Sequence, residues 1–335
     1  MRLLSLWKSN QTDLFLSNNS VLENKYLIVL AGPTASGKTA TAIKLAKAFD
    51  AEIISADSRQ FYKELSIGTA APTAEELTQV KHHFVHNLSI EDKYDVADYE
   101  RDVLNYLKEY FKTKNIAIMT GGSGLFIDAV CNGLDSIPDI SEEIRNKVTR
   151  MLEEGGLEAL QKEVEKVDPE YFQIVDKQNP RRLQRALEVY YQTNRPYSSF
   201  RKKNVAKRDF DIIKLAILWD RDKLIERINK RVDLMMEQGL LDEVKSVYPK
   251  RHLNSLNTVG YKELFDYLDG KCSLEQALDQ IKINTRQYAK RQMTWLRKRN
   301  DYQWFTIDEV DEIIDTLFEK LSVPCGKSFF CKGHQ

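Results

Sequence analysis

The stretch "GPTASGKT", Gly32 to Thr39, decides the fold of this 335-residue chain. It matches G-x-x-x-x-G-K-[ST], the P-loop, whose successive backbone N–H groups wrap around phosphate. The apolar run Tyr26 to Leu30 before it predicts a buried strand, and "TATAIKLAKAF" after it carries apolar residues at helical spacing. A strand, a glycine loop and a helix in this order aim the loop amides and the helix N-terminus at phosphate. The sequence therefore predicts a phosphate-binding site.

The composition indicates a cytosolic protein. Basic and acidic residues balance at 50 each, so the net charge alone indicates no polyanionic partner. No apolar run approaches the ~18 residues of a membrane span, so we expect no membrane partner. Four cysteines lie at scattered positions, which is typical of a reducing compartment: Cys131, Cys272, Cys325 and Cys331. We expect residues 1–24 to form a flexible extension and residues 323–335 a flexible tail, in which Cys325, Cys331 and His334 do not make a zinc site.

Further strands predict an α/β fold. The apolar pair Ile53-Ile54 leads to Asp57, beyond the carboxyl end of the strand, where open parallel sheets bind ligands. "HFVHNL" is a candidate third strand, and "IAIMTGGSGLF" predicts another, with glycines that let the backbone approach a ligand. Residues 138–208 are charged and helical before "LAILWD" restores a strand. We predict a P-loop NTPase-like parallel sheet core at residues 25–137 and 209–322, with an all-helical insertion at 138–208.

The chemistry predicted at the loop is group transfer. P-loop ATPases and GTPases place a carboxylate at the end of a buried strand to hold Mg²⁺, but "IAIMTGG" ends in Thr120 and glycines. The well-placed early carboxylate is Asp57, which suits a general base beside an acceptor. No N-K-x-D signature of a G protein is present. The sequence therefore favours transfer to an acceptor at Asp57 over nucleotide hydrolysis.

Two basic clusters favour a nucleic-acid partner. The stretch Ile281 to Asn300 holds no acidic residue and seven basic ones: Lys282, Arg286, Lys290, Arg291, Arg297, Lys298 and Arg299. Tyr288, Met293 and Trp295 supply apolar anchors within it. The insertion adds "NPRRLQR" and "FRKKN". Clusters of this kind neutralise phosphodiester backbones, although a bland basic surface is the alternative.

Six motifs together resemble the tRNA dimethylallyltransferase family, also called tRNA isopentenyltransferases. They are "GPTASGKT", "ISADSRQFYKELSIGTAAP", "GGSGLF", "PRRLQRALEVY", "NTVGYKEL" and "TRQYAKRQMTWLRK". The resemblance implies transfer of the dimethylallyl group from dimethylallyl diphosphate to tRNA, with Mg²⁺ and release of diphosphate. The acceptor would be the exocyclic amine of the adenine 3′ to the anticodon, in tRNAs that read codons beginning with U. That base would be flipped out of the anticodon stem-loop.

The resemblance also implies residue roles in a monomeric enzyme. Asp57 would accept the proton of the amine, and Ser123 would form a hydrogen bond near the reacting centre. The implied diphosphate ligands are Gly32, Pro33, Thr34, Ala35, Ser36, Gly37, Lys38, Thr39, Arg227 and Arg231, with Thr39 near Mg²⁺. The implied tRNA contacts are Asp57, Ser58, Arg59 and Gln60 around the adenine, with Ser123, Arg145, Arg181, Arg182, Leu183, Gln184, Arg185, Asn257, Thr258, Val259, Gly260, Tyr261, Lys262, Lys290, Arg291, Gln292, Met293, Thr294, Trp295, Leu296 and Arg297.

Two other interpretations stay open on sequence alone. A P-loop kinase for a small molecule would use ATP as donor and Asp57 as base, but it would not need the basic helix or the insertion. An RNA-binding protein would use a nucleotide only as a structural ligand. ATP would also fit the loop, because P-loops accept many phosphates.

Overall fold

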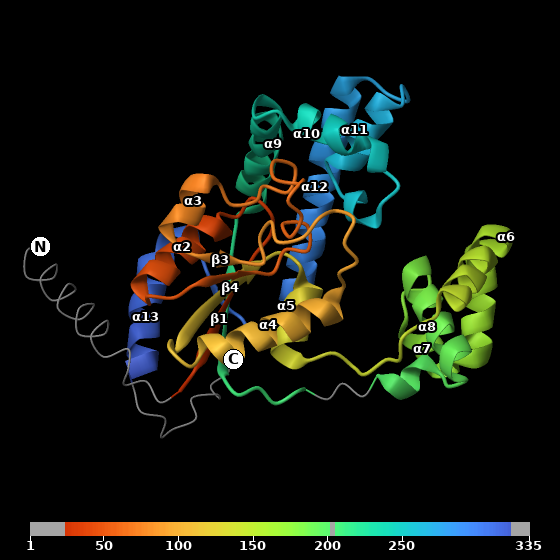
Figure 1. Ribbon diagram of the computed structural model, residues 1–335, viewed down its shortest axis with the longest axis horizontal. Coiled ribbons are helices and arrows are strands. Elements are labelled where there is room, and N and C mark those ends of the chain that lie inside the picture. The colour runs from red at the N-terminus through yellow and green to blue at the C-terminus, as the bar shows by residue number, and fades with distance from the viewer. Residues whose placement is uncertain (1–23, 202–204, 323–335) are drawn as a thin grey trace, which may run out of the picture. The chain divides into compact units, whose positions relative to one another are not determined.

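The computed structural model describes residues 24–201 and 205–322 (Figure 1). The predicted tail at 323–335 and nearly all of the predicted N-terminal extension lie outside the described residues. Lys202, Lys203 and Asn204 of the basic "FRKKN" stretch lie outside them as well. In the part of the chain that is described, no helix is both long and apolar enough to cross a bilayer.

The chain folds as two compact units. One unit runs up to Cys131 and resumes at Arg208, and the other is Asn132–Lys207. The sequence predicts an insertion at residues 138–208, and the second unit in the structure begins six residues earlier and ends one residue earlier, at Asn132–Lys207.

The first unit is built on a parallel sheet of six strands in the order β3-β2-β4-β1-β5-β6. β5 pairs with β1, Tyr26 opposite Asp211, so the chain rejoins the first sheet after the insertion, as predicted. The strands are β1 (Tyr26–Ala31), β2 (Ile53–Ser55), β3 (His82–His83), β4 (Ile116–Gly121), β5 (Asp211–Ile217) and β6 (Gln303–Phe305). The parallel α/β core predicted from the sequence is confirmed.

The third strand is shorter and earlier than "HFVHNL" predicts. β3 covers His82–His83 alone, because Phe84 and His86 have φ angles of 60° and 51°, in the left-handed region. Backbone in that region cannot continue a strand, so the chain turns away from the sheet edge.

Helices cover both faces of the sheet (Figure 1). On one face α4 and α5 pack against Leu27 and Val29, together with the C-terminal part of α12. On the other face α2 and α13 pack against Ile28 and Leu30. A separate core joins α9 to α12 around Tyr261 and Leu264. The helices of this unit are α2 (Lys38–Ala48), α3 (Ala74–Gln79), α4 (Val96–Tyr110), α5 (Gly124–Asn132), α9 (Arg221–Glu237), α10 (Leu240–Val247), α11 (Tyr261–Leu268), α12 (Leu274–Arg297) and α13 (Val310–Ser322).

The second unit is helical, with its own apolar core. It contains α6 (Glu142–Val167), α7 (Pro169–Ile174) and α8 (Pro180–Thr193). α6 is interrupted at Gly156, whose φ of 65° departs from the helical region. Val148 and Leu160 of α6 pack against Leu183 and Leu187 of α8.

The glycines at the end of β4 and just after it allow close packing within the protein. A Cβ at Gly121 would overlap the backbone of Ala56 at the end of β2. At Gly122 it would meet the side chain of Gln292, and at Gly124 the ring of Trp295, both on α12. The glycines therefore let β2 and α12 come within contact of the turn after β4.

We expect Gly121→Ala to destabilise the protein by about 3 kcal/mol, because its methyl group would displace backbone rather than a side chain. Urea denaturation followed by circular dichroism measures the loss. Gly270→Ala is the control, since a Cβ there meets open space and costs about 1–2 kcal/mol through its positive φ of 75°. An equal loss in the two variants would contradict the steric account.

Candidate active site

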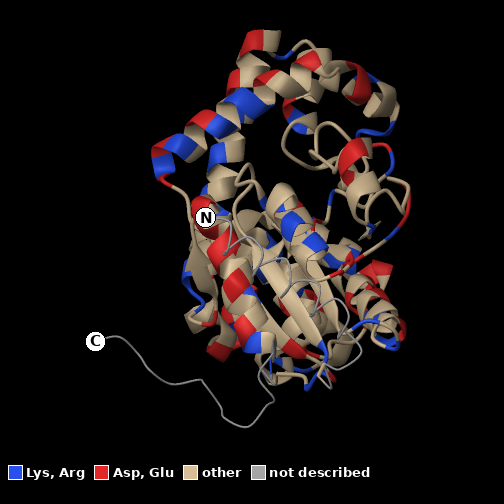
Figure 2. Cartoon of the chain, turned by 90° about the vertical axis from the view of Figure 1, so that its left-hand side faces the viewer, with Lys and Arg blue, Asp and Glu red and all other residues tan. Residues whose placement is uncertain are grey.

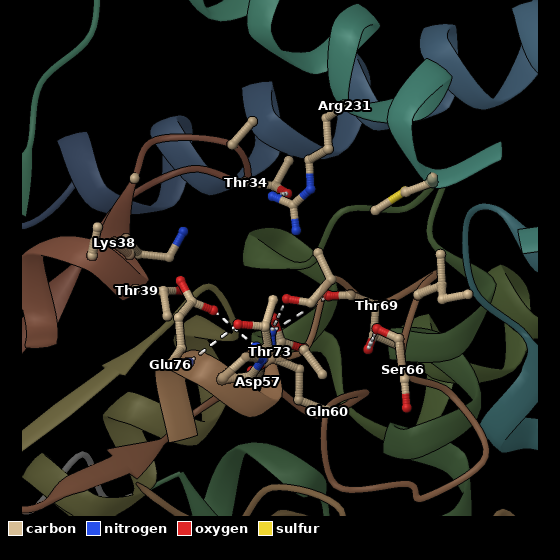
Figure 3. A pocket seen from close by; sticks show the side chains of 18 of the residues that line it. Thr34, Lys38, Thr39, Asp57, Gln60, Ser66, Thr69, Thr73, Glu76 and Arg231 are labelled. Carbon is tan, nitrogen blue, oxygen red and sulfur yellow. Dashed lines mark hydrogen bonds between the residues drawn. The ribbon is translucent and has the colours of Figure 1, made fainter. Parts of the chain in front are cut away.

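A cavity of about 900 Å³ opens beside the P-loop in the first unit. Its lining comes from the P-loop, the end of β2, the segment between residues 66 and 77, and α9. The cationic ends of Lys38 and Arg231 point into it across from Asp57, Gln60 and Thr73 (Figure 3). This arrangement follows from the fold, because the carboxyl ends of parallel strands share one edge of the sheet.

Side chains from α9 and from Trp219, two residues before that helix, hold the P-loop in place. Trp219 Nε1 donates to the carbonyl oxygen of Ser36 at 2.9 Å. Arg227 Nε donates to the carbonyl oxygen of Ala35 at 2.9 Å, and its guanidinium lies over the Trp219 ring. Ala35 has a φ of 63°, which is unfavourable for a residue with a Cβ. The two hydrogen bonds therefore fix a strained turn of the loop.

Gln292 of α12 holds the loop from a second side. Its side-chain oxygen accepts from the Thr34 N–H at 2.8 Å, and its nitrogen donates to the Gly122 carbonyl at 3.0 Å. The side chain is buried and lines the cavity. Gln292 therefore links the P-loop to the turn after β4, and because it also lines the cavity, its contact with tRNA stays a prediction.

The cavity concentrates positive charge. Burial, reinforced by the charge of Arg231 and opposed by Asp57, lowers the pKa of Lys38 to about 7. The Lys38 ammonium donates to the Pro33 carbonyl at 2.6 Å. Burial also lowers the pKa of Arg231, against the opposing charge of Asp57. Two desolvated cations in one cavity form a site for an anion.

Asp57 lies in a hydrogen-bonded turn at the end of β2. Its Oδ1 accepts from the Arg59 N–H at 3.1 Å, and Asp57 lines the cavity. The Ser58 N–H donates to the Ser123 hydroxyl at 3.1 Å. Ser123 is also hydrogen-bonded with Tyr288, whose pKa is raised to about 12 by burial and by the charge of Asp57. The structure thus brings the two predicted catalytic residues together, and it adds Tyr288, which the sequence indicated only as an apolar anchor.

Of the predicted adenine-pocket residues, Asp57 and Gln60 line the cavity, but Arg59 does not. The Arg59 guanidinium instead donates to the carbonyl oxygens of Ser255 at 2.9 Å, Asn254 at 3.2 Å and Asn257 at 3.4 Å. The Arg59 side chain therefore provides hydrogen-bond donors for backbone carbonyl groups in the segment before α11.

The seven basic residues between 281 and 300, which lie on α12 or directly after it, divide into those that pair with another side chain and those that form no ion pair. Lys282 pairs with Asp233 at 2.7 Å, Arg299 pairs with Asp128, and Arg286 bonds Asn229 at 3.4 Å. Within the described residues, the other four form no ion pair and are exposed: Lys290, Arg291, Arg297 and Lys298. Many of the other helices carry both basic and acidic residues (Figure 2). The unpaired stretch is thus a local surface for an anionic partner.

Burial corrects four of the predicted tRNA contacts. The side chains of Leu183, Tyr261 and Leu296 have no more than 1% of their surface exposed, and Gln184 is buried as well. They pack in hydrophobic cores, so they support their helices instead of facing a partner. Arg145, Arg181 and Arg182 are exposed on the second unit, and Arg185 is partly exposed.

The chain matches the family model described as IPP transferase over residues 60–299. It belongs to the IPP transferase family. It is 49% identical over 300 residues to the tRNA dimethylallyltransferase of Christiangramia forsetii, covering 89% of this chain and 99% of that protein. It is 50% identical over 291 residues to tRNA dimethylallyltransferase 1 of Phocaeicola vulgatus, covering 87% and 97%. The family predicted from the six motifs is confirmed.

Solved structures support the same family. The tRNA isopentenylpyrophosphate transferase of Bacillus halodurans is 36% identical, with a TM-score of 0.65, covering 89% of this chain and 97% of that one. A eukaryotic dimethylallyltransferase acting on tRNA is 27% identical, with a TM-score of 0.71, covering 84% and 74%. IPP transferases have a P-loop NTPase-like fold, so the predicted fold class holds for this member.

The pKa of Lys38 predicts pH-dependent anion binding. Lys38 is cationic below pH 7 and loses its proton above it, whereas a bound diphosphate favours the cation. We expect the affinity for inorganic diphosphate to fall above pH 7, by up to about tenfold per pH unit. Isothermal titration between pH 6 and 9 at constant Mg²⁺ measures this dependence.

The control is Lys38→Met, which should bind more weakly but with a flatter profile. Protonation of the diphosphate itself affects both proteins equally, so the difference between the profiles reports Lys38. Parallel profiles would contradict the role of Lys38.

Proposed function

We propose that this chain transfers the dimethylallyl group of dimethylallyl diphosphate to the exocyclic amine of the adenine 3′ to the anticodon. Dimethylallyl transfer to tRNA, which the motifs predict, is confirmed by the family and by the relatives named for that activity. The proposal for the adenine amine and for the diphosphate donor rests on one observation: the P-loop with Lys38, Arg231 and Asp57 all line the same cavity.

The reaction needs a leaving anion and a proton acceptor at one place. The C–O bond between the prenyl carbon and the diphosphate breaks, and its electron pair leaves with the diphosphate. The adenine amine forms the new N–C bond and loses one proton. Lys38 and Arg231 stabilise the negative charge on the departing diphosphate, and Asp57 takes the proton.

The diphosphate-binding residues come from two elements. The loop from Thr34 to Thr39 offers backbone N–H groups and the N-terminus of α2. Arg227 uses its Nε on Ala35, which leaves its terminal nitrogens for phosphate oxygens. We infer that Arg231 binds the diphosphate directly, since it lines the cavity with Lys38.

The lining fits Mg²⁺ as a cofactor. Mg²⁺ usually takes few protein oxygens and fills its octahedral shell with water and substrate phosphates. The cavity offers oxygen donors at Thr39 and Asp57, and in the described residues no cluster of three or more His, Cys, Asp or Glu side chains is built to hold a metal. We propose that Thr39 would hold the ion, which would neutralise charge on the diphosphate.

We propose that the free cations of α12 and the exposed arginines of the second unit bind the anticodon stem-loop. The predicted contacts at Asn257, Thr258, Val259, Gly260 and Lys262, and at Arg291, Met293, Thr294 and Trp295, belong to the same proposal. We also propose that the protein acts as a monomer in the cytoplasm, since its scattered cysteines are typical of a reducing compartment.

Asp57→Asn should lower turnover by about 10²- to 10⁴-fold, because the amide cannot accept the proton but keeps the oxygen bonded to the Arg59 N–H. The affinity for tRNA should change by less than about twofold, since the loss is confined to the transition state. The measurement counts label from radiolabelled dimethylallyl diphosphate in unmodified tRNA. The control is Asp279→Asn on an exposed position of α12.

Near-normal turnover by Asp57→Asn would overturn the base assignment. No label with the wild-type protein, together with ³²P transfer from ATP to a small acceptor, would favour a kinase instead.

Lys290→Ala combined with Arg297→Ala should weaken tRNA binding and make it less dependent on salt. Each lost phosphate contact lowers the slope of log affinity against log salt by about 0.7–0.9. Filter binding at several salt concentrations measures both quantities. The control is Lys108→Ala at the end of α4 with Lys112→Ala just after it, the same change of charge on another exposed surface. An unchanged slope would show that these cations do not contact phosphate.

A further inference from the structure

The carboxylate of Glu243 on α10 binds the loop Ser66–Gly68 through three consecutive N–H groups. Its Oε2 accepts from Ser66 at 2.9 Å and from Ile67 at 2.8 Å. Its Oε1 accepts from the Gly68 N–H at 2.9 Å and from the Tyr261 hydroxyl at 2.6 Å. Each oxygen therefore accepts two hydrogen bonds. Consecutive backbone N–H groups make a concave anion site, and here a side chain of the protein fills it.

The loop bound in this way forms part of the cavity wall. Ser66 and Ile67 line the cavity, as do Leu234 and Met235 of α9. This apolar part belongs to the same cavity as the cationic P-loop. A ligand with an anionic end and a short hydrocarbon end matches such a lining, since its apolar end gains from burial against Ile67 and Met235.

We propose that Glu243 is a positioning residue, which holds the loop Ser66–Gly68 as the wall against which the dimethylallyl group lies. The proposal rests on the proposed function, because that function supplies the prenyl donor. Glu243 acts through the loop and touches neither the diphosphate nor the acceptor.

Tyr261 fixes the carboxylate. Its side chain is fully buried in the core of α9 to α12, and burial with the charge of Glu243 raises its pKa, so its hydroxyl stays a donor. A Cβ at Gly68 would collide with the Tyr261 ring, so the loop packs directly on that ring. The loop is thus held by packing against Tyr261 and by the hydrogen bonds that its N–H groups donate to Glu243.

Glu243→Gln tests the proposal, because the amide replaces one acceptor oxygen with a donor and leaves two of the four hydrogen atoms unpaired. We expect the Kd for dimethylallyl diphosphate to rise by about tenfold or more. The Kd for inorganic diphosphate should change by less than about twofold, since that anion does not reach the loop. Isothermal titration of both ligands at the same Mg²⁺ measures the two shifts. Asp242→Asn, on the same helix and exposed, is the control for the lost charge.

Hydrogen exchange gives a second measurement that does not depend on the donor. The amides of Ser66, Ile67 and Gly68 should lose protection in Glu243→Gln but keep it in Asp242→Asn. Tyr261→Phe is the milder variant in case Glu243→Gln does not fold, and it should shift the dimethylallyl diphosphate Kd in the same direction. Tyr267→Phe on the same helix is its control.

Equal weakening of both ligands, or of neither, would overturn the proposal. Unchanged exchange at Ser66 to Gly68 would overturn it independently of any ligand. Failure of the proposed function would look different, since the wild-type protein would then transfer no label to tRNA.

Discussion

The P-loop depends on hydrogen bonds from residues that follow it by nearly 200 positions or more. Trp219 and Arg227 bind the carbonyl oxygens of Ser36 and Ala35, and Gln292 binds the N–H of Thr34. Ala35 stays in a left-handed conformation that a residue with a Cβ rarely adopts, so the turn needs outside support. The phosphate site therefore depends on distant parts of the chain, namely the second half of the sheet, α9 and α12, because residues from them hold the P-loop in its conformation.

Burial of charge gives the site its chemistry. Burial lowers the pKa of both Lys38 and Arg231, and the negative charge of Asp57 opposes this lowering in each. Such an arrangement costs stability without an anion and is relieved when a diphosphate enters. In the proposed reaction, the P-loop holds the leaving group of a carbon transfer. The fold alone does not determine that chemistry, because P-loop proteins also transfer phosphoryl groups.

Much of the fold and of the site followed from local sequence. Apolar runs of residues predicted the parallel core and the return of the chain at β5. The polar residues that follow such a run predicted that Asp57 lies beyond β2. The third strand was misplaced, because positive φ angles at Phe84 and His86 leave no mark in hydrophobicity. Gly121 lines the cavity, in keeping with the interpretation of these glycines as ligand contacts, but the sequence does not show that Ala56 and Gln292 approach Gly121 and Gly122.

The sequence by itself determined the P-loop, the carboxylate of Asp57 beyond β2 and the family, since each rests on residues that are close together or on motifs in a fixed order. Only the tertiary structure decided which members of those motifs face the cavity. Arg59 turns to the carbonyls before α11, Gln292 lines the cavity and also supports the P-loop, and Glu243, which lies outside the motifs, accepts from the amides of Ser66 to Gly68. The physical reason is that buried polar groups must form hydrogen bonds, and the packing of distant segments decides which groups are close enough to do so.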